Sequence, residues 1–515
     1  MTHTLFLYLH SGYTSEILSN PENEGMSTQD LKTPKGANRS LWIMGLSIIL
    51  VLYVHTSLSP ALPIMAEDFG VDYSLVTWVL TAYLVSGAAV TIIIGRLADI
   101  YGAKKMLLVV FICYTVGVIL APFAQEFYTL IGLRILQGVA VALVPVSVRI
   151  ARDLFPPARF PFAQGMILSM YQGGSAVGLV LGAAVVYFVG WEGVFLSAIP
   201  FALLFLFLLW KFIPKVVEEK VVKDTTPKRF SKIVDIPGLI TLILTVSTFM
   251  LSITFLGGGT DQSIGLFWIF LAIGIVSIVA FFVIENRSKI PLVDLKLAFH
   301  RIIRVGNVIY LLLGIVQYII FSTIPTLGQT PEPYGLGLSV LQVGGLQLPQ
   351  ALVFVILGPI AGILAVKYGN LKFIIPGSII LTVGILVLMF LHSSYAEVAG
   401  SLVLFAVGGA FITLSANVII FFTPLESTAV VSATYSTMRI IGGAIGPVIA
   451  GVFLSLYTSE VTTTTDVGTT TTTSVPNDMA FNTIFLIGAV CSLVIIAFMW
   501  IMRRRALSMG MPANK

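Results

Sequence analysis

Two ionisable side chains, a histidine and an arginine, stand inside long apolar runs of this sequence. His55 lies in the run 41–63, and Arg134 lies in the run 128–150 with Gln137 one helical turn further along. A guanidinium in hydrocarbon is expensive and by default indicates a functional role. Histidine changes charge near pH 6.5 (about its ordinary pKa), which suits proton exchange. We therefore interpret His55 as the candidate proton carrier, coupled to Arg134 through substrate or water; a packing histidine and a structural arginine are the alternatives.

Acidic side chains, the usual groups for proton exchange in a membrane, are missing from the interior of the apolar runs. None of the 24 Asp and Glu falls in the middle of a run, whereas Arg439 lies well inside the run 429–456. A cavity with arginine and no acid disfavours cations, because nothing offsets their desolvation. The sequence therefore favours neutral or anionic amphipathic substrates. The candidates for contact with them are Tyr83, Gln172, Gln317 and Arg439; packing roles, or for Arg439 a position nearer the membrane surface, are the alternatives.

Composition places the chain among polytopic membrane proteins. Its 515 residues are 57% hydrophobic and 10% charged, with a mean hydropathy of +0.99, whereas soluble domains carry about 25% charged residues. Its two cysteines lie in apolar runs and no metal-ligand spacing is present, so we expect no disulfide framework, no metal and no cofactor. The expected partners are a small-molecule substrate, protons and the lipid bilayer, with no nucleic acid, and the chain is expected to act as a monomer.

Fourteen apolar runs are long enough to cross a bilayer, which takes about 20 residues. They predict an all-α polytopic membrane protein with fourteen transmembrane helices, most of them separated by short turns. The runs cover 41–63, 75–97, 106–123, 128–150, 161–188, 192–213, 235–256, 264–285, 303–328, 341–366, 373–392, 397–423, 429–456 and 480–502.

The charges between these runs predict how the chain is oriented. Of the 29 Lys and Arg, only Arg134 and Arg439 lie well inside runs. The others lie in the tails, in loops that follow even-numbered runs or at the ends of runs beside them, and none lies in a loop that follows an odd-numbered run. Lys and Arg collect in cytoplasmic loops. We therefore expect a multi-pass protein of the plasma membrane with both termini in the cytoplasm.

Two sequence features recur eight runs apart. The charged turn 95–105 follows the second run, and a weaker copy, 362–372, follows the tenth. Glycine-rich stretches stand in the fifth and thirteenth runs, and small residues at this spacing let helices approach closely in lipid. The positions where we expect such packing are Gly173, Gly174, Gly178, Gly442, Gly446 and Pro447. An offset of eight fits a six-plus-six repeat with two inserted helices, and internal repeats are typical of alternating-access transporters.

The repeat and the loop lengths predict the domain organisation. We expect a disordered cytoplasmic tail, an N-terminal six-helix bundle, a cytoplasmic linker with two inserted helices, a C-terminal six-helix bundle with a threonine-rich extracellular spacer, and a second cytoplasmic tail. Their ranges are 1–40, 41–213, 214–302, 303–502 (with the spacer at 457–479) and 503–515.

The motifs of residues 41–505 are similar to those of the major facilitator superfamily, and within it of the fourteen-spanner drug:H+ antiporters. The turn 95–105 resembles the superfamily signature G-x-L-a-D-r-x-G-r-k, and 130–138 looks like the signature l-x-x-x-R-x-x-q-G of the fourth span. The stretch 442–451 resembles the glycine-proline signature of antiporters. The resemblance implies two six-helix bundles plus two inserted helices, and a role for Arg134 in proton coupling.

The resemblance also implies that the turn 95–105 is a conformational gate. Asp99 would then form a contact in one conformation and lose it in the other, although a static salt bridge is the alternative. The gate residues are Gly95, Asp99, Gly102, Lys104 and Lys105. One departure from the branch concerns the acid that usually precedes Ala-Leu-Pro in the first span, because Val54 occupies that position and His55 stands beside it.

These features predict a secondary active transporter, with proton-coupled efflux of hydrophobic, amphipathic or anionic small molecules by alternating access. An uncoupled facilitator is the alternative, supported by the missing acid. A membrane-embedded enzyme is more distant, because the sequence has no H-E-x-x-H motif and no acid cluster that would hold a metal.

Overall fold

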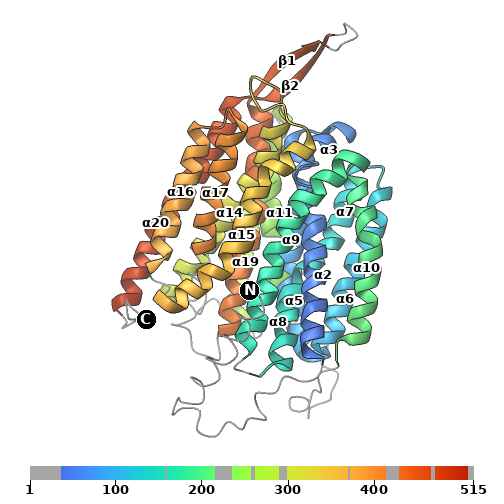
Figure 1. Cartoon of the computed structure of the whole chain (residues 1–515), viewed down its shortest axis with the longest axis vertical. Helices are drawn as coiled ribbons and strands as arrows, with labels where there is room; N and C mark the ends of the chain where they lie inside the picture. Colours follow the sequence, from blue (N-terminus) through green and yellow to red (C-terminus); the bar gives the residue numbers. More distant parts are fainter. Residues whose placement is uncertain are drawn as a thin grey trace, which may run out of the picture.

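The computed structural model describes residues 36–156, 159–214, 235–256, 261–288, 299–368, 372–412, 428–464 and 470–508. Within these ranges the chain is almost entirely helical, and the long helices stand side by side in one bundle (Figure 1). The all-α fold class is confirmed. Helix α2 already begins at Ala37, inside the segment 1–40 that we expected to be a tail.

The first half of the chain contributes the helices on one side of the bundle. Most of them are apolar around their whole circumference, as suits a helix with protein on one side and lipid on the other. They are α2 (Ala37–Ser57), α3 (Leu62–Asp68), α4 (Tyr73–Val76), α5 (Trp78–Tyr101), α6 (Ala103–Leu120), α7 (Phe127–Gly138), α8 (Leu143–Leu154), α9 (Phe160–Val189) and α10 (Glu192–Phe212).

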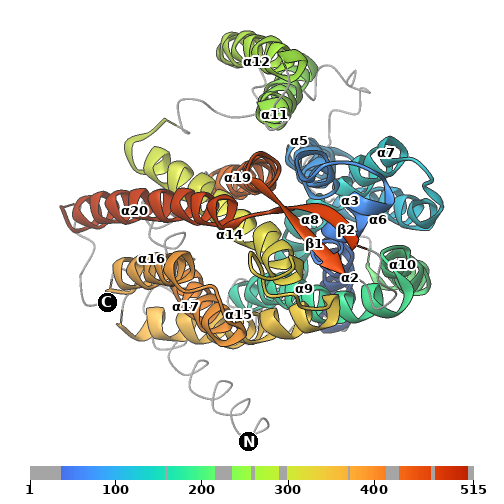
Figure 2. The ribbon, with the colours of Figure 1, turned by 90° about the horizontal axis from the view of Figure 1, so that it is seen from above.

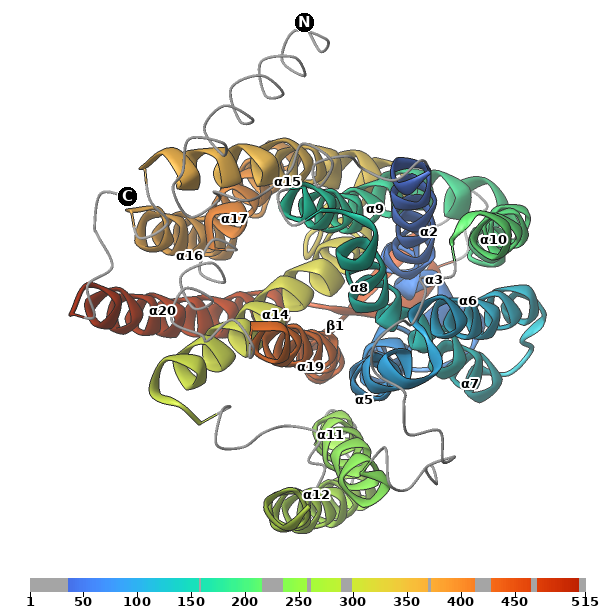
Figure 3. The same ribbon diagram turned by 90° about the horizontal axis from the view of Figure 1, so that it is seen from below.

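The second half contributes the other side, and an additional helix pair lies outside both (Figures 2 and 3). The helices of the second half are α14 (Arg301–Gln329), α15 (Val340–Tyr368), α16 (Ile374–Phe390), α17 (Tyr395–Ile412), α19 (Thr428–Leu456) and α20 (Asp478–Ser508). The additional pair is α11 (Ile236–Leu256) and α12 (Asp261–Arg287), of which α11 packs against α5 and α19 while α12 packs against α11.

Twelve helical stretches in the described residues are long and apolar enough to cross a membrane. Two shorter apolar stretches, Gly173–Val189 and Ile374–Phe390, stand at the fifth and eleventh predicted runs. The number of fourteen spans therefore stays a prediction. The ends of the described chain, at α2 and α20, lie at one end of the bundle, opposite a β-hairpin (Figure 1).

Buried apolar side chains form two clusters, one for each half of the chain. The first gathers mostly side chains of α2 to α10, with Val246 and Met250 of α11 and Val340 of α15, and the second gathers side chains of α14 to α20. Ala444 and Val448 of α19 belong to the first cluster, so the two halves share packing along α19. Hydrogen bonds also cross between the halves, from Ser59 Oγ to Phe321 O (2.6 Å) and from Gln329 Nε2 to Pro60 O (2.8 Å).

The charged turn 95–105 is much shorter than the sequence indicates. Helix α5 continues to Tyr101 and α6 starts at Ala103, so only Gly102 lies between them. Residues such as Leu97 and Ala98 favour a helix, and they extend it beyond the apolar run. Gly102 has φ +94°, a conformation that a residue with a Cβ rarely adopts.

The threonine-rich spacer contains an antiparallel β-hairpin that we did not predict. Strand β1 (Thr458–Thr464) pairs with β2 (Thr470–Pro476), with Thr458 opposite Pro476 and Thr464 opposite Thr470. Threonine is β-branched and is enriched in strands. The composition that excluded a core at 457–479 therefore still favours a two-stranded ribbon.

Candidate functional site

Arg134 lies at the centre of a buried polar cluster in the first half of the chain. Its side chain is 0% exposed. Its Nε donates to the carbonyl of Val79 (2.8 Å), and its Nη1 donates to Oε1 of Gln137 (2.5 Å). Gln137 in turn donates from Nε2 to the carbonyl of Gly117 (2.8 Å). The cluster therefore connects α5, α6 and α7, and the two bonds donated by Arg134 involve a charged group, which makes them among the stronger ones in proteins.

His55 of α2 completes this cluster. Arg134 Nη2 lies 3.0 Å from His55 Nδ1. A guanidinium only donates hydrogen bonds, so Nδ1 must accept and Nε2 of the neutral ring must carry the proton. The His55 ring stacks on Tyr83 with centroids 4.3 Å apart and planes at 20°, and Arg134 Cζ lies 4.8 Å from the centre of the same ring. Tyr83 therefore supports both members of the pair.

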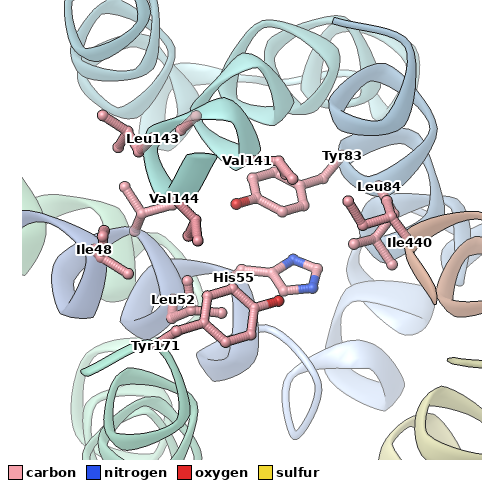
Figure 4. Close-up of a pocket in the computed structure, with 12 residues that line it drawn as sticks. Ile48, Leu52, His55, Tyr83, Leu84, Val141, Leu143, Val144, Tyr171 and Ile440 are labelled. Atoms are coloured by element: carbon pink, nitrogen blue, oxygen red, sulfur yellow. The ribbon is translucent and has the colours of Figure 1, made fainter. Parts of the chain in front are cut away.

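The free edge of His55 faces a small cavity between the halves. Figure 4 shows His55 between Tyr83 and Tyr171, with Leu84 of α5 and Ile440 of α19 at the cavity wall. The cavity has a volume of about 10 Å³, which is the space of about one water molecule. Among the described atoms, His55 Nε2 is buried and has no hydrogen-bond partner. An acceptor that enters this cavity would meet an unpaired N–H.

A second and larger cavity lies where the two halves face each other. Its volume is about 50 Å³, and side chains of α2, α9, α14 and α15 line it. The polar ones are Thr56, Ser175, Gln317, Tyr318 and Gln350. Gln317 Oε1 accepts a hydrogen bond from Nη2 of Arg439 (2.6 Å), so an arginine of α19 stands next to this cavity.

Comparison with known proteins places this arrangement in a family. The sequence profile described as "Major Facilitator Superfamily" matches residues 44–285 and 306–510. The chain belongs to the Major Facilitator Superfamily. It is therefore a multi-pass membrane transporter of small molecules and not an enzyme, and the major facilitator fold predicted from the sequence is confirmed.

The superfamily members most relevant to this chain include drug transporters. The chain is 29% identical over 440 residues to "Multidrug efflux pump LfrA" of Mycolicibacterium smegmatis, which covers 84% of this chain and 83% of the relative. It is 28% identical over 377 residues to "Multidrug resistance protein 3" of Bacillus subtilis (72% and 70%). Among solved structures, a bacterial homologue of the human lysosomal transporter Spinster has the same fold, with a TM-score of 0.60 at 15% identity over 94% of this chain and 99% of that one.

The gate residues expected from the superfamily signature lie at the junction of α5 and α6. Gly95 and Asp99 belong to α5, but the Asp99 side chain lies outside the described atoms. Lys104 Nζ donates to the carbonyl of Trp210 (2.8 Å) at the end of α10, a favourable place for a cation. Lys105 Nζ lies 5.6 Å from the ring centre of Tyr101. Both lysines therefore contact residues of the first half of the chain.

The glycines of α9 occupy positions of close helix contact. A Cβ on Gly174 would lie 2.8 Å from Cα of Ile49, and one on Gly178 would lie 1.9 Å from Oγ1 of Thr56. A Cβ on Gly173 would meet nothing within 4 Å, so this residue has no such contact. The glycines of α9 therefore differ from one another, although they form one run in the sequence.

The corresponding glycines of α19 pack against α14 in the same way. A Cβ on Gly442 would lie 2.0 Å from the carbonyl oxygen of Leu311, and one on Gly446 would lie 2.8 Å from that of Ile315. Pro447 follows inside the same helix. The pairs α2·α9 and α14·α19 are both closely packed, as an internal repeat of the superfamily type implies.

The sequence did not single out several residues that line the two cavities. Tyr171, Phe321 and Gln350 come from three different helices, and nothing in their local sequence separates them from packing residues. Gln172 stands beside Tyr171 in α9, but its side chain lies outside the described atoms. Helical periodicity could have grouped residues of one helix, but not residues of several.

The inserted pair α11–α12 has two buried acidic residues, Asp235 and Glu285, at the ends of predicted runs. Asp235 is 8% exposed and Glu285 is 2% exposed. Both approach Gly238, where a Cβ would lie 2.8 Å from Oε2 of Glu285 and 3.1 Å from Cγ of Asp235. Asp235 Oδ1 also accepts from the Gly238 N–H (2.9 Å), so it caps the first turn of α11.

Proposed function

We propose that this transporter exports hydrophobic, amphipathic or anionic small molecules across the plasma membrane in exchange for protons, by alternating access. The observation that carries the proposal is the Arg134–His55 contact, because it places a titratable ring in hydrogen-bond contact with a buried cation. The relatives named for multidrug efflux and multidrug resistance support export and small drug-like substrates. The termini are assigned to the cytoplasm by the charge asymmetry of the loops.

Proton exchange in this proposal depends on which nitrogen of His55 is occupied. Nε2 already carries a proton in the neutral ring, so a second proton must bind at Nδ1, where Arg134 donates. Arg134 must then withdraw, both because Nδ1 no longer accepts and because two cations in a buried site repel each other. Protonation of His55 is therefore coupled to a rearrangement of α2 relative to α7.

The remaining parts of the proposal follow the superfamily pattern. Fourteen spans, built as two six-helix bundles and the inserted pair α11–α12, make up a monomeric transport unit. Gly95, Asp99 and Gly102 form a gate at the cytoplasmic end of α5. Asp99 makes its contact in one conformation only, so the gate opens and closes with each cycle.

Reconstitution into lipid vesicles tests the proton coupling. We expect the wild type to move a labelled substrate several-fold faster under an imposed pH gradient than after an ionophore collapses the gradient. His55→Gln keeps a hydrogen-bonding side chain but does not titrate, so its flux should be the same with and without the gradient. If His55→Gln responds to the gradient as strongly as the wild type does, His55 is not the proton carrier.

The same vesicles test the second candidate function, an uncoupled facilitator. The specific observation in its favour is Val54, which stands where the related antiporters usually have an acid and is 0% exposed. A facilitator would give wild-type flux that follows only the substrate gradient, at any imposed pH difference. That result would mean that the protein equilibrates its substrate across the membrane and does not export it against a substrate gradient.

A further inference from the structure

The two arginines inside the bundle differ in how many of their donors are engaged. A guanidinium has five N–H donors. Arg134 donates to three different groups and is fully buried. Arg439 is partly buried, and among the described residues its one hydrogen bond is the bond to Gln317. Arg439 therefore retains unused donors and a charge that no described carboxylate neutralises.

Close packing between α14 and α19 holds Arg439 in this place. A Cβ on Gly314 would lie 2.2 Å from the carbonyl oxygen of Arg439, so only glycine lets the two backbones approach this closely. Gln317 follows Gly314 by three residues and stands on the same side of α14. The contact between Arg439 and Gln317 is therefore a consequence of helix packing, and it does not depend on a substrate.

Gln317 connects Arg439 to the cavity of about 50 Å³, because it lines this cavity and accepts a hydrogen bond from Arg439. Its Oε1 accepts from Arg439, which leaves the two N–H donors of the amide for another group. Thr56 and Ser175 present hydroxyl groups from the other half of the protein, and no acidic side chain is among the described residues that line this cavity. Its volume exceeds that of one water several-fold. The two hydroxyl groups already donate to backbone carbonyls. The donors that these three side chains leave at the cavity are therefore those of the Gln317 amide, with the charge of Arg439 directly behind them.

Aromatic side chains border the same cavity. Tyr318, Phe321 and Phe354 line it together with Gln317. Gly443 supports the Tyr318 ring, because a Cβ there would lie 2.9 Å from Cδ2 of that ring. A ligand that combines a flat apolar group with a small charged group would find both requirements met within one cavity.

We propose that Arg439, with Gln317, binds the anionic group of an aromatic organic anion, a carboxylate or sulfonate, and so determines the preference of the transporter for anions. The inference rests on the proposed transport function, since it names the substrate class of that site. The anionic group accepts hydrogen bonds from the Arg439 guanidinium and the Gln317 amide, and the ring system lies against Tyr318, Phe321 and Phe354. Arg134 does not take this role, because its guanidinium nitrogens already donate within the cluster.

Equilibrium binding to the purified full chain in detergent tests the inference, with nalidixic acid and its uncharged ethyl ester as a matched pair of probes. We expect Arg439→Gln to weaken binding of the acid at least tenfold and binding of the ester less than twofold. Arg439→Lys keeps the charge without the planar fork, so it should recover part of the affinity for the acid. The matched control is Arg304→Gln, which removes an exposed charge of α14 and should change neither affinity.

Three other outcomes of the binding measurement would overturn the inference. Equal loss for the acid and the ester would indicate a structural role, and unchanged affinity for the acid would show that Arg439 does not contact the anionic group. An equal loss in Arg304→Gln would indicate a general electrostatic effect. Binding is measured without a membrane potential or a pH gradient. A protein that discriminates acid from ester but shows no gradient-driven flux therefore disproves the proposed proton coupling and leaves the inference intact.

Discussion

Arg134 donates a hydrogen bond from Nη2 to Nδ1 of His55 across 3.0 Å, at a place where neither side chain reaches solvent. The two residues are 79 positions apart in the sequence and come from α7 and α2. The bond determines the tautomer of the ring and directs Nε2–H at the cavity shared with α19. A change at Arg134 should therefore alter what the cavity presents, although Arg134 itself does not line it.

Arg134→Lys should impair the transporter although the charge is kept. One ammonium group cannot reach Val79, Gln137 and His55 in the directions that the guanidinium does, and a hydrogen bond to a charged group contributes about 1.5–3 kcal/mol. We expect a lower unfolding temperature of the purified protein and at least tenfold slower transport. Arg304→Lys, at an exposed position, is the control. Wild-type transport in Arg134→Lys would contradict the geometric argument.

The ring of Tyr83, and not its hydroxyl, should be required. The ring stacks on His55 and lies under Arg134, and stacked rings contribute about 0.5–1.5 kcal/mol beyond the area they bury. Tyr83→Phe should keep wild-type transport and thermal stability, whereas Tyr83→Leu should lose several-fold in transport rate and a few degrees in unfolding temperature. Measuring both variants separates the two parts of the side chain. A Phe variant as poor as the Leu variant would assign the role to the hydroxyl.

Two glycines of α9, Gly173 and Gly178, should respond differently to the same substitution. A Cβ at Gly178 would lie 1.9 Å from Thr56 Oγ1 and 2.7 Å from the carbonyl of Tyr53, so α2 must move. Forcing extra atoms into a packed contact costs about 1–3 kcal/mol, and we expect Gly178→Ala to lower the unfolding temperature by several degrees. Gly173→Ala is the matched control, since a Cβ there meets nothing within 4 Å. Equal effects would indicate helix propensity and not packing.

Asp99→Asn should abolish transport while the protein still accumulates in the membrane. Asp99 lies in the last turn of α5, where the helix dipole disfavours a carboxylate, so a second contact has to compensate in at least one conformation. The matched control is Asp153→Asn, which removes an exposed partner of Arg149 (3.4 Å) and should leave transport near the wild-type rate. Flux and membrane abundance are measured together. Full flux in Asp99→Asn would remove the gate from the proposed cycle.

The helical architecture could be predicted because apolar runs of sufficient length have few other structures available in lipid. Helix ends could be predicted less well, because an amphipathic last turn such as that before Gly102 extends a helix beyond its apolar run. The threonine-rich hairpin shows a related difficulty, since composition excluded a core but did not predict pairing of β1 with β2.

The residue types of the site were predictable, but their contacts were not. A buried arginine and histidine are costly in lipid wherever they stand, so Arg134 and His55 could be chosen from the sequence alone. Their hydrogen bond depends on where the bundle places α2 relative to α7, and the cavity next to Arg439 depends on how α14 meets α19. Those relations arise from glycine contacts such as Gly314 with the Arg439 carbonyl, which a single sequence does not reveal.

The inserted pair makes the two lateral sides of the transporter unequal toward the bilayer. Helix α11 packs against both α5 and α19, and Trp78 Nε1 of α5 donates to Thr254 Oγ1 of α11 across 2.8 Å. On that side α11 therefore lies over the seam between the halves (Figure 2). On the opposite side, where α9 packs directly against α15, no inserted helix pair is described over the seam between the halves. The extra helices thus cover one of the two seams between the halves and leave the other to the direct contact of α9 with α15.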